Sequence, residues 1–391
     1  MSWKTIRADE FCESVRDGTH DTPKPNETGY KLVTGKHVKN GQIDPSDAYY
    51  ISEKDYKKIN ERSLVEQWDV LMSMIGTVGE VAVVKDHPNY AIKNVALFKC
   101  GGSELKGKWL AYYLRSSDAQ GHMSGNQKGS SQQFLSLNQL RSLPIPITDE
   151  RYMQRVIDIL SAYDELIENN QKQIKLLEEA AQRLYKEWFV DLRFPGHETT
   201  PIVDGVPEGW KEQSLYQIAD VVMGQSPKSE YYNQVGEGLP FHQGVGSYGN
   251  RFVSDETYST SFTRIAEAGS ILFSVRAPVG RLNLTKNKVV IGRGLAAINH
   301  RRGAQSYLFY LLKEKFFRDD IIGNGSIFAS ISKEELLNQT FLIPIDSLVE
   351  QFNGIAGGID KKIDILSEQI RLLTEARDRL LPKLMSGEIE V

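Results

Sequence analysis

Residues 150–189 read ERYMQRVIDILSAYDELIENNQKQIKLLEEAAQRLYKEWF, and this stretch decides the fold. Mostly apolar side chains recur in it alternately at every fourth and third position, which is the heptad pattern of a helix that packs along one stripe. The stripe consists of Val156, Leu160, Tyr163, Ile167, Asn170, Ile174, Leu177, Ala181, Leu184 and Trp188. At 1.5 Å per residue such a helix would be roughly 60 Å long, and so long a helix with one apolar stripe needs a partner to cover it.

The same stripe recurs 196 residues later. Its positions are Phe352, Ala356, Ile359, Ile363, Leu366, Ile370, Leu373, Arg377, Leu380 and Leu384. Because fused halves of a duplicated chain tend to keep a two-fold relationship, we expect an antiparallel coiled coil with pseudo-two-fold symmetry, without an interior proline in either helix. The alternative is that each helix packs only on its own domain. Asn170, which stands where the second copy has Leu366, either fixes the register of the pair or faces solvent.

Other motifs return at nearly the same spacing. Lys-Trp-Leu-Ala-Tyr-Tyr-Leu at 108–114 resembles Ser-Tyr-Leu-Phe-Tyr-Leu-Leu at 306–312, and the stretch 69–79 resembles 270–280. A tandem duplication explains these matches. Outside the helical stretches, short apolar runs broken by Gly and Pro accompany one clear helix per copy, which is typical of an α+β fold. We therefore predict two α+β domains and two helical regions, at 1–149, 150–200, 201–345 and 346–391.

The composition, with 40% apolar and 25% charged residues, indicates a globular protein. No apolar stretch reaches the roughly 20 residues of a membrane span, and the N-terminus lacks the apolar part of a signal peptide, so we expect a cytoplasmic protein. Two cysteines are too few for a disulfide framework or a structural zinc site. The net charge of −4 is unusual for a nucleic-acid binder. No acidic residue occurs between Glu267 and Glu314, however, which allows a locally basic face there.

The chain carries no familiar catalytic motif. No P-loop is present, and the Gly-x-Gly-x-x-Gly pattern at 244–249 is not followed by the helix that would hold a pyrophosphate. The seven histidines show no metal-binding spacing, so we expect neither a catalytic site nor a metal site. These absences favour a binding protein. The alternatives are an enzyme with unfamiliar motifs, such as a methyltransferase or nuclease, and a coiled-coil scaffold without a nucleic-acid role.

Three stretches resemble the specificity subunits of type I restriction-modification enzymes. The C-terminal Arg-Leu-Leu-Pro-Lys-Leu-Met-Ser-Gly-Glu-Ile-Glu-Val at 379–391 is similar to the family's ending, and Leu-Tyr-Lys-Glu-Trp-Phe-Val-Asp-Leu-Arg-Phe at 184–194 to its central region. Val-Pro-Glu-Gly-Trp at 206–210 is similar to the start of a target recognition domain. The first copy departs from this pattern because it begins at Trp3 without the Pro-Glu-Gly lead.

This resemblance implies a DNA-recognition subunit that is not itself an enzyme. The two α+β domains would be target recognition domains, each reading one half of a bipartite, asymmetric site in double-stranded DNA. The coiled coil would set the spacing of the half-sites and dock two methyltransferase subunits. The resemblance implies that S-adenosylmethionine, ATP and Mg²⁺ bind to the methyltransferase and motor-nuclease subunits, and that this chain binds no cofactor.

Side chains that read base edges or bind phosphates are usually basic or amide groups, hydroxyls or imidazoles on loops. In the first domain, two polar loops and the acid-free stretch 28–43 supply such groups. The candidates are Thr19, His20, Lys36, His37, Lys39, Asn40, Asn126, Lys128, Ser130, Ser131 and Gln132. An ordinary solvated loop is the alternative for each of them.

In the second domain the corresponding loops supply a further set. Its members are Gln225, Ser226, His242, Gln243, Ser247, Tyr248, Asn250, Arg251, Asn324 and Ser326, with Arg276, Arg281 and Arg293 as candidate phosphate or guanine contacts. On the helices, we expect Trp188 and Leu384 to lie at the end of the coiled coil or at the methyltransferase interface.

Overall fold

The computed structural model of the chain describes residues 3–75, 78–124, 135–316 and 330–391. The chain divides into two compact units. Unit 1 comprises residues 1–170 and 368–391, and unit 2 comprises residues 171–367. None of the described helices combines the length and the apolar character that crossing a bilayer requires.

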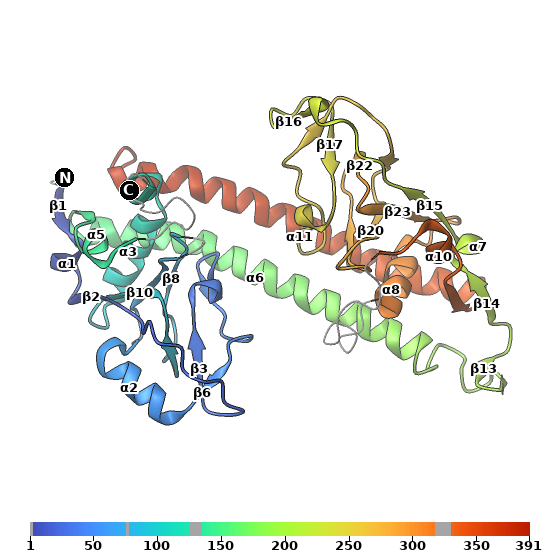
Figure 1. Cartoon of the computed structure of the whole chain (residues 1–391), viewed down its shortest axis with the longest axis horizontal. Helices are drawn as coiled ribbons and strands as arrows, with labels where there is room; N and C mark the ends of the chain where they lie inside the picture. The colour runs from blue at the N-terminus through green and yellow to red at the C-terminus, as the bar shows by residue number, and fades with distance from the viewer. Residues whose placement is uncertain (1–2, 76–77, 125–134, 317–329) are drawn as a thin grey trace. The chain divides into compact units, whose positions relative to one another are not determined.

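Unit 1 begins with a mixed α/β part (Figure 1). Its strands are β1 (Lys4–Arg7), β2 (Ser14–Asp17), β3 (Tyr30–Val33), β4 (Val38–Lys39), β5 (Gln42–Ile43), β6 (Tyr50–Ile51), β7 (Val70–Ser73), β8 (Val81–Val83), β9 (Tyr90–Ile92), β10 (Val95–Lys99) and β11 (Pro144–Ile147). Its helices are α1 (Ala8–Phe11), the 3-10 turn η1 (Gly35–His37), α2 (Glu53–Ser63), α3 (Glu104–Arg115), α4 (Ser117–Ser124) and α5 (Leu137–Arg141).

A four-stranded antiparallel sheet with the order β2-β10-β7-β8 forms the centre of unit 1. Every residue of β7 and β10 is buried, because both faces of the sheet are covered. Phe98 packs on one face in a cluster with Trp109 of α3, whereas Leu97 packs on the other with Ile92 of the small sheet β6-β3-β9. Adjacent residues of a strand point to opposite faces of the sheet, which explains this alternation. Helix α3 lies between the sheet and the long helix (Figure 1).

Unit 2 contains the second mixed part. Its strands are β12 (Ile202–Val203), β13 (Val206–Pro207), β14 (Lys211–Ser214), β15 (Ala219–Met223), β16 (Tyr232–Asn233), β17 (Leu239–His242), β18 (Tyr258–Ser259), β19 (Ile265–Ala266), β20 (Ile271–Ser274), β21 (Leu282–Leu284), β22 (Val289–Ile291), β23 (Leu295–His300) and β24 (Thr340–Ile343). Its helices are α7 (Leu215–Ile218), the 3-10 turns η2 (Ser229–Tyr231) and η3 (Val245–Ser247), α8 (Gln305–Phe316) and α10 (Lys333–Leu337).

The topology of unit 2 repeats that of unit 1. The order β15-β23-β20-β21 matches β2-β10-β7-β8, and the ribbon β14-β24 matches β1-β11. In the smaller sheets, β17 runs parallel to β22 as β3 runs parallel to β9. The predicted duplication and the α+β class are therefore confirmed. Helix α2 is specific to unit 1 among the described residues.

Two long helices, α6 (Glu150–Phe189) and α11 (Asp346–Ser386), contribute residues to both units. In unit 1, the hydroxyl of Tyr152 donates to the carbonyl oxygen of Leu384 at 3.0 Å. Further along α6, the Asn170 amide donates to Gln369 Oε1 at 3.3 Å. The start of α6 thus meets the end of α11, which confirms the antiparallel pair. Asn170 is only 7% exposed, so it faces the partner helix and not solvent.

In unit 2 the same two helices pack through aromatic side chains. The rings of Tyr185 and Trp188 lie 5.7 and 6.0 Å from that of Phe352, and Ala181 and Ala356 are fully buried beside them. Each helix also packs on the sheets and short helices of its unit. Both alternatives for the helices are therefore true in part. The helices pair with each other, each also packs on its domain, and these contacts belong to one core.

The structure corrects one detail of the second helix. Pro382 lies inside α11, whereas an uninterrupted helix was expected. The missing amide removes the bond to the carbonyl of Asp378, a residue on an exposed part of the helix where water can take its place. Because α11 ends four residues later, at Ser386, the loss is confined to its last turn. Trp188 and Leu384 are both core residues.

Candidate nucleic-acid interface

In unit 1, the chain leaving β2 turns back over the connection between β9 and β10. The amide of Gly18 donates to the carbonyl of Val95 at 2.9 Å, and the amide of Thr19 to that of Ile92 at 3.0 Å. A Cβ on Gly18 would lie 2.4 Å from the carbonyl oxygen of Ile92, so only glycine fits there. These bonds place Thr19 and His20 at the rim of the unit, half-buried and exposed respectively.

Unit 2 makes the same turn with different side chains. The amide of Gln225 donates to the carbonyl of Ile291 at 2.9 Å, and Gly224 precedes it in the place of the unit 1 glycine. A Cβ on Gly224 would again collide with backbone, at 2.1 Å. Gln225 and Ser226 therefore occupy the positions that threonine and histidine occupy in unit 1.

In unit 1 the imidazole of His20 joins two loops. Its Nδ1 lies 2.8 Å from Asn94 Oδ1, and its Nε2 lies 2.9 Å from Asp17 Oδ2. Asp17 also pairs with Arg62 of α2. A cleft of about 440 Å³ opens beside them, lined by Thr19, His20, Arg62 and other polar residues. Sequence reasoning missed Asn94 and Arg62, although an asparagine between two apolar runs is a turn signal. In the structure Asn94 has a φ of 54°.

In unit 2 the equivalent place holds a cluster of hydroxyl, amide and guanidinium groups. Ser226 donates to Gln243 Oε1 at 2.8 Å, and the backbone amide of Arg293 donates to Ser226 Oγ at 3.2 Å. Gln225, Gln243 and Arg293 are exposed. Four predicted residues from three separate loops, after β15, β17 and β22, are thus brought together.

A second loop follows β3 in unit 1. Lys39 and Asn40 are exposed at the turn between β4 and β5, where Asn40 has a φ of 52°. The ammonium of Lys36 lies 2.8 Å from Asp47 at the surface. These three predicted residues are accessible to a ligand.

His37, in the same loop, is a correction. It is only 4% exposed, and its Nδ1 accepts the backbone N–H of Thr34 at 2.7 Å. Burial lowers the pKa of His37 more than the carboxylate of Asp47 raises it. The net shift is therefore downward from 6.5, and the ring is neutral at pH 7. We therefore assign His37 to the framework of the loop, since its ring cannot reach a ligand.

Two predicted residues of unit 2 are corrected for the same reason. His242 is 1% exposed, and its ring nitrogens lie 2.9 Å from Ser247 Oγ and 3.1 Å from Asp255 Oδ1. Tyr248 is half-buried, but its hydroxyl is enclosed and burial raises its pKa. Both support the loop 244–253 from within, whereas Asn250 is exposed at its tip.

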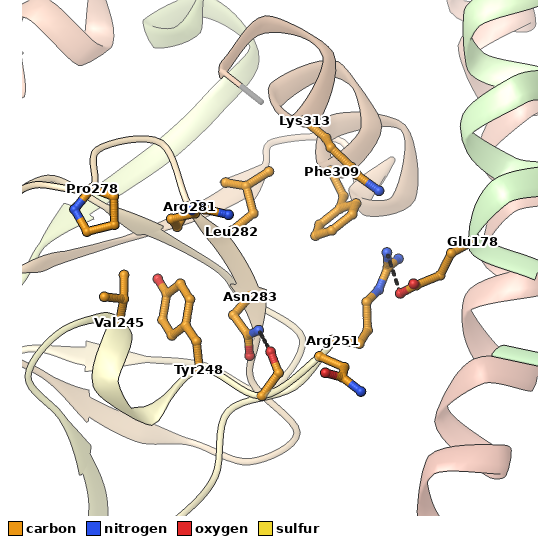
Figure 2. Close-up of a pocket in the computed structure, with 12 residues that line it drawn as sticks. Glu178, Val245, Tyr248, Arg251, Pro278, Arg281, Leu282, Asn283, Phe309 and Lys313 are labelled. Carbon is orange, nitrogen blue, oxygen red and sulfur yellow. Dashed lines mark hydrogen bonds and ion pairs between the residues drawn. The ribbon is translucent and has the colours of Figure 1, made fainter. Parts of the chain in front are cut away.

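Arg251 is the third correction in this unit. It is only 4% exposed and lies over the ring of Phe309 at 3.8 Å (Figure 2). Its guanidinium pairs with Asp360 and lies 3.9 Å from Glu178. A guanidinium that is buried against two carboxylates is not accessible to DNA as expected, because the helices cover it.

A cavity of about 420 Å³ adjoins Arg251. It is lined by Arg281, Asn283 and Lys313 together with apolar side chains such as Leu282 (Figure 2). Arg281 is half-buried there, while Arg276 is exposed on the preceding loop. Of these two arginines, Arg276 has the accessibility of a phosphate contact, as Arg293 also has in the loop after β22.

Seven predicted residues lie outside the described residues. They are Asn126, Lys128, Ser130, Ser131, Gln132, Asn324 and Ser326. Within the described part of the chain, no group of three or more His, Cys, Asp or Glu side chains is placed to hold a metal ion. The loops around His20 in unit 1 and around Gln243 in unit 2 present hydrogen-bond donors and acceptors on a fixed backbone. Such groups suit recognition of base edges and phosphates.

Residues 1–179 and 207–372 match the family model described as the type I restriction modification DNA specificity domain. The chain is 28% identical over 403 residues to the putative type I restriction enzyme MjaX specificity subunit of Methanocaldococcus jannaschii, covering 100% of this chain and 94% of that one. It is 25% identical over 359 residues to the MjaIX specificity subunit of the same organism, covering 87% and 82%. The crystal structure of the type I restriction-modification S subunit from M. genitalium has the same fold, with a TM-score of 0.57 at 16% identity over 98% and 96% of the two chains.

Proposed function

The chain belongs to the type I restriction-modification DNA specificity family, and from this we propose how its two units divide the work of DNA recognition. The chain is a DNA-recognition subunit and not itself a catalyst. Unit 1 reads one half of a bipartite site through the loops around His20 and Asn40. Unit 2 reads the other half through the loops around Gln243 and Asn250.

One observation carries this assignment: matching backbone positions hold chemically different side chains. The turn after β2 presents Thr19 and His20, and the turn after β15 presents Gln225 and Ser226, although both turns make the same backbone hydrogen bonds. Because each base pair offers its own pattern of donors and acceptors in the major groove, two such sites read different sequences. The recognised site is therefore asymmetric.

The long helices supply a surface for protein partners. Several large apolar side chains lie on them outside the heptad stripe and are exposed. They are Leu166 and Leu372 in unit 1, and Leu176, Ile355 and Ile365 in unit 2. We propose that these side chains form part of an interaction surface. We assign one methyltransferase subunit to the helices of each unit, two in all, with motor-nuclease subunits joining through the complex.

The cofactors belong to those partners in this proposal. S-adenosylmethionine would bind to the methyltransferase subunits, and ATP with Mg²⁺ to the motor-nuclease subunits. This chain contributes sequence recognition in this proposal.

A methyl-transfer assay tests the proposal. The chain alone, and the chain with its methyltransferase subunits, are incubated with DNA and labelled S-adenosylmethionine. We expect no transfer by the chain alone, and transfer by the complex to adenines in one bipartite sequence. Transfer by the isolated chain would contradict the proposal, and so would a complex that methylates DNA without regard to sequence.

A further inference from the structure

Arg251 connects the turn 248–253 with both long helices of unit 2. Its guanidinium pairs with Asp360 of α11 and lies 3.9 Å from Glu178 of α6. The hydroxyl of Tyr310 on α8 donates to the same Asp360 at 3.3 Å. One carboxylate on α11 thus joins the turn to a helix of the recognition domain (Figure 2 shows Arg251 beside Glu178).

Unit 1 has the same junction around Asp164 of α6. Tyr112, which the duplication aligns with Tyr310, donates to Asp164 Oδ2 at 2.9 Å. Arg115 of α3 lies 3.2 Å from the same oxygen. Arg377 of α11 lies 2.7 Å from Oδ1. The carboxylate again joins a recognition-domain helix to the paired helices.

The arginine that reaches the carboxylate comes from a different element in each unit. The turn 38–43 in unit 1 and the turn 248–253 in unit 2 have equal lengths and matching pairings at their ends. In this alignment of the turns, Gly41 of unit 1 corresponds to Arg251 of unit 2. On the helices, Arg115 of unit 1 corresponds to Lys313 of unit 2. A Cβ on Gly41 would lie 3.5 Å from Arg115 Nη1. A guanidinium therefore adjoins both turns, from the helix in unit 1 and from the turn itself in unit 2.

Stability alone is a weak reason for such a junction. Burying an ion pair seldom stabilises a protein more than apolar packing would, but separating the two partners is costly because it leaves an uncompensated buried charge. Here the geometry concerns Asn250 and Asn40, which are exposed at the tips of the two turns, one beside the buried Arg251 and the other beside the half-buried Arg115. The junction thus fixes candidate DNA-contacting side chains against the helices.

We propose that Arg251 is a positioning residue that sets the recognition turn of unit 2 against α6 and α11, so that it determines how strictly the complex enforces the spacing of its two half-sites. Arg115 has the same role for the turn of unit 1. This inference rests on the proposed function, because it requires that the two units read two half-sites on one DNA molecule.

The test uses the complex of this chain with its methyltransferase subunits. Its substrate is a DNA pool in which the half-sites are kept and the spacer is native, one base pair shorter or one base pair longer. The variant Arg251→Gln removes the charge and keeps a polar side chain. Arg302→Gln is the matched control, because Arg302 also joins the recognition domain to α11, through Asp346 at 2.5 Å, but at the exposed surface.

We expect the wild type and Arg302→Gln to methylate the native spacer at least tenfold faster than the altered ones. In Arg251→Gln this ratio should fall about tenfold, while the sequence preference for the half-site of unit 1 is unchanged. The double variant Arg251→Gly with Lys313→Arg gives unit 2 the arrangement of unit 1 and should restore the ratio. It also carries the test if Arg251→Gln fails to assemble.

Two results would overturn the inference. One is an Arg251→Gln complex that keeps the wild-type spacer ratio or loses rate by the same factor on every DNA. The other is a double variant that assembles but does not regain the ratio. A wild-type complex without any sequence preference would instead contradict the proposed function, so the two failures are distinguishable.

Discussion

Tyr112 and Asp164 lie 52 positions apart in the chain, yet the tyrosine hydroxyl donates to the carboxylate at 2.9 Å. Arg115 and Arg377 contact the same carboxylate, at 3.2 and 2.7 Å. The cluster ties the helix that covers the central sheet to both long helices of unit 1.

Replacing Asp164 by Ala should destabilise the protein by about 3 kcal/mol, because Arg115 would lose its counter-charge and Arg377 would keep only Asp378. Tyr112→Phe should cost less, about 1.5–3 kcal/mol, since it removes one hydrogen bond to a charged group. Urea unfolding measures both. Asp158→Ala, an exposed change on the same helix, is the control and should be near neutral. Equal stability of wild type and Asp164→Ala would refute the role of the junction.

The contribution of Asp164 should depend on pH. Burial works against its charged form, but Arg115 and Arg377 outweigh burial and lower its pKa below the ordinary 3.8. A carboxyl with a lowered pKa stabilises the folded state above its unfolded pKa, and loses this effect as the pH falls through the folded value. The stability difference between wild type and Asp164→Asn should therefore be constant above about pH 5 and shrink below pH 4. A difference that grows on acidification would contradict the assignment.

Asn170 and Leu366 occupy equivalent positions of the two heptad stripes, and we expect opposite effects on stability when each is replaced by the other. Asn170→Leu replaces a buried amide by the residue of the second copy and should raise stability by about 1 kcal/mol, since a polar group in a coiled-coil seam costs stability. The reciprocal Leu366→Asn buries an amide in an apolar seam and should lower stability by at least as much. Thermal melts compare the two. A loss on Asn170→Leu would mean that its bond to Gln369 outweighs the desolvation of both amides.

The proposed docking surface gives a binding prediction. Leu176 and Ile365 are 64% and 45% exposed on the helices of unit 2. Replacing both by Gln should leave the fold intact and weaken methyltransferase binding at that unit by tenfold or more, because apolar contact area is lost. Val203→Ser, on the exposed hairpin β12-β13, is the control. Sedimentation should then show a complex with one methyltransferase subunit, whereas two subunits on the variant would exclude this surface.

The long-range pattern of the sequence predicted the helices and the duplication, since heptads and repeats persist over many residues. It could not separate buried from exposed polar side chains within a loop. Arg251 and Asn250 are neighbours in one polar stretch, yet only the arginine is covered, by helices that lie far away in the sequence. Asn94 was missed because its partner, His20, comes from a loop 74 positions earlier. Such pairings depend on the tertiary fold.

The most direct measurement is the sequence motif methylated by the complex, determined for wild type, His20→Ala and Gln243→Ala by sequencing methylated DNA from a random pool. We expect the wild type to give a bipartite, asymmetric motif. Each variant should lose discrimination in one half only, by about 1–3 kcal/mol for a base contact, and the two variants should affect opposite halves. Loss in the same half, or equal loss in both halves by either variant, would contradict the claim that each unit reads its own half-site.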